Sequence, residues 1–136
     1  DWISGRRLDQ IEAEFSTNAY FGRIEYGDIR RFADTTRFHL QSASDIIAIL
    51  LLDKNPQAEL ASLLIQLEVG LPAHALGLLQ LPLTLTRGEH LNLISLGITT
   101  PEQFWAVGSE TMSKALGESR ARYIEKFRPA KSAAAH

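Results

Sequence analysis

In one long stretch of this chain, residues 27–51, apolar side chains recur at helical spacing. The apolar positions form a single stripe: Ile29, Phe32, Ala33, Thr36, Leu40, Ala43, Ile47 and Leu50. A periodic stretch of this length predicts one long helix whose stripe faces a core. No segment shows the alternation typical of a strand, so we expect an all-α fold.

The opposite side of this expected helix carries an aromatic ring. At about 100° per residue, Phe38 lies about 180° from Ile29, and Arg31 lies about 200° from it. An arginine and a flat ring on one exposed face suit a single nucleic-acid strand, because the guanidinium binds phosphate and the ring stacks on a base. The alternative is that Phe38 packs on a neighbouring helix or domain, and geometry alone leaves both open.

Composition excludes several classes of protein. No apolar run approaches the roughly 20 residues of a membrane span, and the first residues lack the basic and apolar regions of a signal peptide. The 136-residue chain has no cysteine, which excludes disulfides and thiolate zinc sites. We expect a cytoplasmic or nucleoid-associated protein.

The net charge of −2 excludes a strong overall basic field, but the basic residues are unevenly placed. They gather near the expected long helix and near the end of the chain. The first group is Arg23, Arg30, Arg31 and Arg37, and the second is Lys114, Arg120, Arg122, Lys126, Arg128 and Lys131. Local basic surfaces are therefore expected.

The rest of the chain is typical of short helices bounded by local start and stop signals. We expect them at 4–15, 56–69, 71–79, 86–96, 100–107, 110–116 and 119–127. Tyr20, Phe21 and Tyr26 are expected to anchor the connector before the long helix. We expect these elements to form two lobes, residues 1–66 and residues 67–130. Residues 131–136 are expected to be a disordered tail.

Several motifs in the first lobe resemble a known family. These motifs are Trp2-Ile3-Ser4-Gly5, Ile11-Glu12 and Gly27-Asp28-Ile29-Arg30-Arg31, followed by Phe38. Together they resemble the superfamily 2 helicases (DEAD/DEAH-box type) that include archaeal repair helicases and HELQ. The resemblance implies a helical domain whose long "ratchet" helix lies across the single strand. Arg30, Arg31 and Phe38 would then contact nucleic acid, although that family has tryptophan where Phe38 stands, which weakens stacking.

The second lobe resembles the terminal helix–hairpin–helix region of the same helicases, through residues 67–72, 78–82 and 93–98. The family's Gly-apolar-Gly turn is replaced here by Thr84-Leu85-Thr86, whose Cβ atoms hinder close approach of backbone N–H groups to a phosphate. Arg87 and the threonine hydroxyls remain candidate contacts. The alternative is a purely structural hairpin.

A second, partial hairpin follows at Ala115-Leu116-Gly117. It keeps one glycine, and Ala121 and Ile124 stand at the expected packing positions. Arg120 and Arg122 flank them, so Gly117, Arg120 and Arg122 are further candidates for contact with a nucleic-acid backbone.

The chain lacks the sequence signals of a catalyst. It has no GxxxxGK[ST] phosphate loop, so ATP and Mg²⁺ would belong to the motor of a larger parent, and no cofactor is expected here. The histidines His39, His74, His90 and His136 show no metal-binding spacing. Asp34 and Asp45 lie about 16 Å apart by helix rise, too far for joint acid–base chemistry. We expect no catalytic residue, no metal site and no small-molecule substrate.

The sequence thus predicts the C-terminal accessory region of a superfamily 2 helicase, one that guides single-stranded DNA or RNA. The motor domains of the same parent would be its protein partner, and no membrane partner is expected. The alternative is a protein-interaction or autoinhibitory docking module that does not bind nucleic acid.

Overall fold

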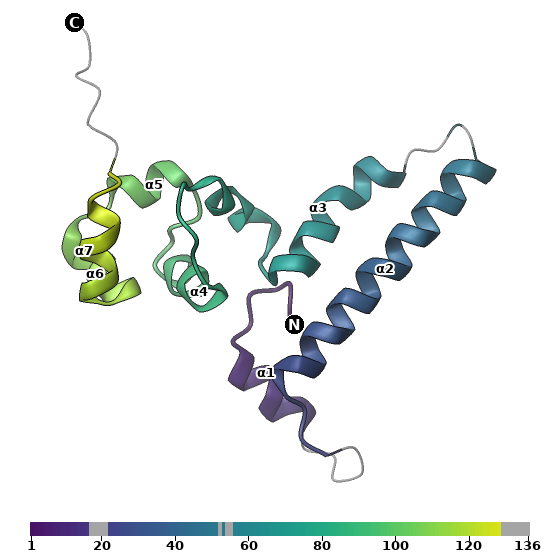
Figure 1. The fold of residues 1–136 in the computed structure, drawn as a ribbon, viewed down its shortest axis with the longest axis horizontal. Coiled ribbons are helices and arrows are strands. Elements are labelled where there is room, and N and C mark those ends of the chain that lie inside the picture. Colours follow the sequence, from purple (N-terminus) through teal and green to yellow (C-terminus); the bar gives the residue numbers. More distant parts are fainter. Residues whose placement is uncertain (17–21, 52, 54–55, 129–136) are drawn as a thin grey trace, which may run out of the picture. The chain divides into compact units, whose positions relative to one another are not determined.

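The computed structural model describes residues 1–16, 22–51, 53 and 56–128 (Figure 1). It has helices but no strand within those ranges, which confirms the all-α prediction. The elements are α1 (Leu8–Phe15), α2 (Tyr26–Leu50), α3 (Pro56–Val69), the 3₁₀ helix η1 (Ala73–Gln80), α4 (Arg87–Ser95), α5 (Pro101–Ala106), α6 (Ser109–Leu116) and α7 (Glu118–Glu125).

The chain forms two compact units, Asp1–Ala73 and His74–His136. The boundary drawn from the sequence, between residues 66 and 67, falls inside α3, whereas the observed division follows that helix. The expected tail at 131–136 and the anchors Tyr20 and Phe21 lie outside the described residues.

The first unit is built around α2, with α3 packed beside it. Its small buried core consists of Trp2, Ile11, Ile29 and Ala33. Trp2 Nε1 donates a hydrogen bond of 2.8 Å to the Leu67 carbonyl, so this side chain ties the start of the chain to α3. The Trp2 indole is therefore a core anchor of the first unit.

Local backbone signals set where the first helices begin. α1 begins at Leu8 rather than Ser4, because Gly5 adopts φ +81° and interrupts a helix there. α2 begins at Tyr26, where the Glu25 N–H donates to Asp28 Oδ2 at 3.2 Å. Asp28 therefore lies in the first turn and satisfies an otherwise unpaired N–H from inside the helix.

The second unit has the larger core, with ten buried residues: Leu78, Leu81, Leu85, Leu93, Ile98, Phe104, Met112, Ala115, Ala121 and Ile124. Helices α4 and α5 begin close to the predicted positions 86 and 100, each at a capping box formed by a threonine and the side chain three residues later. The short helix expected at 71–79 is a 3₁₀ helix, Ala73–Gln80.

Helix length and hydropathy bear on membrane insertion. In the part of the chain that the structure describes, no single helix is both long and apolar enough to cross a bilayer. One bent pair, Leu60–Val69 with Ala73–Gln80, meets the length and composition limits only when its two helices are counted together.

The apolar stripe of α2 is only partly covered, which differs from the sequence prediction. Ile29 and Ala33 are buried, but Phe32 is 60% exposed and Leu50 is 72% exposed. The buried face of α2 is displaced from the apolar stripe toward Ser44. This residue is 1% exposed and lies about 60° around the helix from Ile29. α3 thus packs on one flank of the stripe rather than on the stripe itself.

Candidate nucleic-acid interface

Phe38 and Arg31 are both exposed on α2. Phe38 is 68% exposed, and the Arg31 side chain is 71% exposed. Seven residues of helical rise separate them by about 10 Å on the same side of the helix. Within the first unit Phe38 is not packed into the core, so the ring is free to meet a ligand.

The surroundings of Phe38 are mixed in charge. Its ring meets the His39 ring edge-on, with centroids 5.6 Å apart. On its other side lies a shallow hollow of about 330 Å³ lined by Asp34, Arg37, Phe38, Gln41 and Leu64. The ring therefore stands at the rim of a surface depression between α2 and α3 rather than on a smooth apolar face.

The basic residues of α2 have different roles. Arg31 lies 3.1 Å from Asp28 Oδ1 and places its guanidinium 5.7 Å from the centre of the Phe32 ring. Arg30 instead donates to the Glu68 carbonyl and lies 3.5 Å from Asp34. Arg30 therefore holds α2 to the end of α3, while Arg31 remains the more accessible of the two charges.

Arg37 is a third arginine on α2, to which the sequence assigned no role. Its guanidinium lies 3.0 Å from Glu68 and 3.5 Å from Asp34. Asp45, farther along, accepts hydrogen bonds from Gln41 and Gln57 at 3.0 and 3.1 Å. The carboxylates near Phe38 are thus engaged with partners of this unit, which reduces their repulsion of a phosphate.

In the first hairpin, residues of the turn form hydrogen bonds within the hairpin itself. The Thr86 hydroxyl accepts from the Glu89 N–H at 3.2 Å, and Glu89 Oε2 accepts from the Thr86 N–H at 2.7 Å. Leu85 is buried, and Arg87 is half-buried at the start of α4. The His90 ring is also buried, and its Nδ1 lies 2.9 Å from the Thr86 carbonyl. The observed bonds satisfy the Thr86 N–H within the hairpin.

The second hairpin has a more open turn. Gly117 joins α6 directly to α7 at φ +84° and ψ 153°, a conformation essentially restricted to glycine. A Cβ added there would meet nothing within 4 Å, so the turn surface is sterically accessible. Ala121 and Ile124 are buried against the core, as the sequence predicted. Glu118 in the first turn adds a negative charge beside any bound phosphate.

Arg120 and Arg122 occupy different environments, although both flank this turn. Arg120 Nε lies 3.0 Å from Glu89 Oε1, and its NH2 donates to the Thr84 carbonyl. Arg122 is 81% exposed and pairs only loosely with Glu118, at 3.3 Å. Arg120 therefore links the two hairpins, and Arg122 is the residue whose charge reaches solvent.

The structure brings the sequence-predicted residues into two sets. Arg30, Arg31 and Phe38 lie in the first unit, and Arg87, Gly117, Arg120 and Arg122 lie in the second. Sequence reasoning missed the Arg120–Glu89 link, since these residues are far apart in the chain. Within the described residues, no group of three histidine or acidic side chains is arranged to hold a metal ion. Comparison with protein-family models, with curated proteins and with solved structures finds no match to this chain.

Proposed function

We propose that this chain is the C-terminal accessory region of a superfamily 2 helicase and that α2 guides a single strand of DNA or RNA. Arg31 binds a phosphate, and Phe38 stacks on a base. The exposure of the Phe38 ring, 68% on a face without core contacts, is the observation that carries the proposal. Base stacking on such a ring contributes about 1–3 kcal/mol.

The second unit supports the strand in this proposal. Arg122, next to the accessible Gly117 turn, is its best-placed phosphate ligand, with Arg87 as a further candidate. Arg30 and Arg120 position the surface rather than contact the strand, because their guanidinium groups bind carbonyl and carboxylate oxygens within their own units. The motor domains of the parent would supply ATP-driven movement.

Binding by this chain alone should be weak and salt-sensitive, because few phosphates are contacted. We would measure fluorescence anisotropy with labelled single-stranded and duplex oligomers of DNA and RNA at about 50 and 200 mM salt. Arg31→Ala should reduce the salt slope by roughly 0.7, the value expected for one lost phosphate contact on a single strand. Arg7→Ala, which removes another exposed arginine of the same unit, is the matched control.

Duplex binding stronger than single-strand binding, or equal losses from Arg31→Ala and Arg7→Ala, would contradict the proposal. A chain that binds neither oligomer but binds a helicase motor protein would favour the docking alternative.

A further inference from the structure

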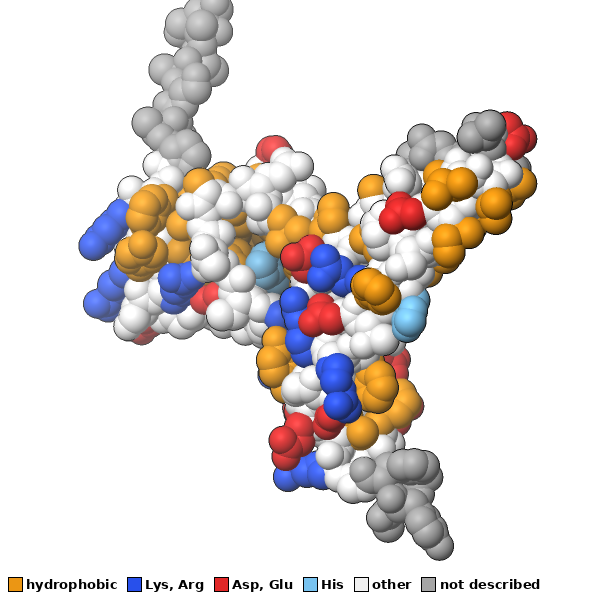
Figure 2. Space-filling model, turned by 45° about the vertical axis from the view of Figure 1, so that its right-hand side comes forward, with side chains coloured by type: hydrophobic (Ala, Val, Ile, Leu, Met, Phe, Trp, Pro, Cys, Tyr) orange, Lys and Arg blue, Asp and Glu red, His pale blue; other side chains and the backbone are white. Residues whose placement is uncertain are grey.

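One face of α2, which overlaps the apolar stripe at four positions and carries Thr36 and His39, is left uncovered by the first unit. Its outward positions follow a four–three spacing: Phe32, Thr36, His39, Ala43, Ile46 and Leu50. All six are exposed, with Ile46 at 55% and Leu50 at 72%. Hydrophobic side chains gather toward the C-terminal end of α2 in Figure 2. A four–three repeat is the spacing by which one helix packs along another.

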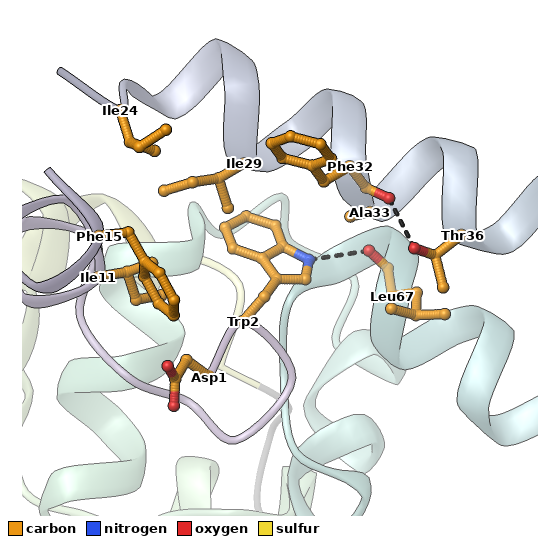
Figure 3. Close-up of a pocket in the computed structure, with 10 residues that line it drawn as sticks. All are labelled: Asp1, Trp2, Ile11, Phe15, Ile24, Ile29, Phe32, Ala33, Thr36 and Leu67. Atoms are coloured by element: carbon orange, nitrogen blue, oxygen red, sulfur yellow. Dashed lines mark hydrogen bonds between the residues drawn. The ribbon is translucent and has the colours of Figure 1, made fainter. Parts of the chain in front are cut away.

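A hollow lies at the other end of the same face. This open cavity of about 420 Å³ is lined on α2 by Ile29, Phe32, Ala33 and Thr36, and it is bordered by mostly apolar neighbours (Figure 3). These neighbours are Asp1, Trp2, Ile11, Phe15, Ile24 and Leu67. The Trp2 indole N–H and the Thr36 hydroxyl already donate to the carbonyls of Leu67 and Phe32, both at 2.8 Å. Whatever fills this cavity must therefore be largely apolar.

We propose that the occupant is the α2 helix of a second copy of this chain, paired antiparallel across a two-fold axis near residue 41. In this register Leu50 of each copy lies opposite Phe32 of the other and enters the cavity beside it. Ile46 lies opposite Thr36, and His39, a large side chain, lies opposite Ala43, a small one. A two-fold pairing fills both cavities at once, because each copy carries one protruding end and one hollow end.

Charge favours the same orientation. The first half of α2, Tyr26–Arg37, carries three arginines and two aspartates, a net charge of +1. The second half, Phe38–Leu50, carries only Asp45, a net charge of −1. Except for Asp28, these charged side chains lie about 100° or more around the helix from Phe32 and Leu50, so they act on the second copy only from a distance. Antiparallel pairing puts halves of opposite net charge alongside each other and opposes the two helix dipoles. Parallel pairing would place like charges together.

The paired surface adjoins the proposed strand-binding face, because its His39 meets the Phe38 ring edge-on and Arg31 lies beside the Phe32 ring. Phe38 lies about 120° around the helix from Phe32 and Leu50, so it faces away from the second copy. The contact strip runs from Phe32 to Leu50, about 27 Å by helical rise. An interface one helix wide and this long is at the small end of specific interfaces, so we expect weak pairing that depends on concentration.

Sedimentation equilibrium of the full chain from about 5 to about 200 µM tests the proposal. The mass should rise with concentration from 15.1 kDa toward twice that value. Leu50→Glu should keep the chain monomeric throughout, with an unchanged helical circular dichroism spectrum because the side chain is exposed. Ile49→Glu is the matched control: Ile49 is 73% exposed but lies off this face, so this variant should still dimerise.

A disulfide test establishes the orientation, since the chain has no cysteine of its own. Mixed Thr36→Cys and Ile46→Cys proteins should form disulfides between the two variants and not within either one. Links within each variant would show parallel pairing and overturn the proposal. A chain that stays monomeric at the highest concentration, or equal effects of Leu50→Glu and Ile49→Glu, would also overturn it and leave this face to a different protein.

Discussion

Arg120 and Glu89 join the two hairpins of the second unit: the Arg120 Nε lies 3.0 Å from Glu89 Oε1 across 31 residues of sequence. Glu89 also caps α4 through the Thr86 N–H, so one carboxylate serves both contacts. The Arg120 guanidinium further binds the Thr84 carbonyl and lies 5.6 Å from the centre of the Tyr123 ring. These contacts hold the two turns in a fixed arrangement.

Arg120→Ala should destabilise the protein by about 1–3 kcal/mol, because it leaves a half-buried carboxylate and a carbonyl without their partner. Urea unfolding measures this loss. Arg122→Ala is the matched control and should change stability by less than about 0.5 kcal/mol, since Arg122 forms only an exposed pair within α7. Similar losses in both variants would refute the assigned difference between these arginines.

Replacing glycine by alanine should have opposite effects on stability at Gly117 and at Gly27. Gly117→Ala should cost about 1–3 kcal/mol from backbone conformation alone, since φ is +84° and no atom opposes the added Cβ. Gly27→Ala, inside α2 with equally open surroundings, should instead stabilise by about 0.5–1 kcal/mol. Thermal unfolding of both variants shows whether the first is less stable and the second more stable than the native chain.

Because the hydroxyl of Ser44 is buried, we expect that replacing this residue by alanine stabilises the protein. Ser44 is 1% exposed, and its Oγ has no hydrogen-bond partner among the described residues. Ser44→Ala should therefore raise the free energy of unfolding by about 1 kcal/mol, because it removes an unsatisfied polar group and favours the helix. Ser42→Ala, whose hydroxyl already donates to the Phe38 carbonyl, should change stability by less than about 0.5 kcal/mol. Destabilisation by Ser44→Ala would show that the hydroxyl has a partner in solution.

His90 predicts a dependence of stability on pH. Burial lowers the pKa of His90 below its ordinary value, and the hydrogen bond to the Thr86 carbonyl and the charge of Glu89 only partly oppose this shift. The unfolded chain therefore binds a proton more readily than the folded chain as pH falls below about 6.5, so stability decreases there and is fully retained above it. His90→Gln should lose less stability than the native chain between about pH 7.5 and 5.5. Equal losses in urea unfolding would contradict this role.

The sequence predicted those parts of the fold that depend on near neighbours. The α4 and α5 starts follow from Thr86 and Thr100, whose capping partners stand three residues away. Likewise, Ala121 and Ile124 were expected to pack at the second hairpin, and both are buried. Helical phase alone placed Arg31 and Phe38 on one side of α2, opposite Ile29, but left open whether Phe38 packs on a neighbour; the ring is 68% exposed.

Contacts between residues that are far apart in the chain could not be predicted from the sequence. Periodicity placed Leu50 on the stripe that was expected to face a core, but α3 packs on the flank near Ser44 and leaves Leu50 exposed. Arg120 was assigned to a phosphate because its partners Glu89 and Thr84 approach it only in the folded unit. A single sequence identifies which faces of a helix are apolar but not which of them a neighbour covers.

Single-strand binding by a series of Phe38 variants shows whether the ring stacks on a base. Phe38→Leu keeps an apolar side chain but removes the ring, so loss of stacking should weaken binding by about 1–3 kcal/mol, and Phe38→Ala should weaken it at least as much. Phe38→Trp, with a larger ring, should bind more tightly than the native chain. If Phe38→Leu and Phe38→Trp bind a labelled single strand as the native chain does, base stacking on α2 is contradicted.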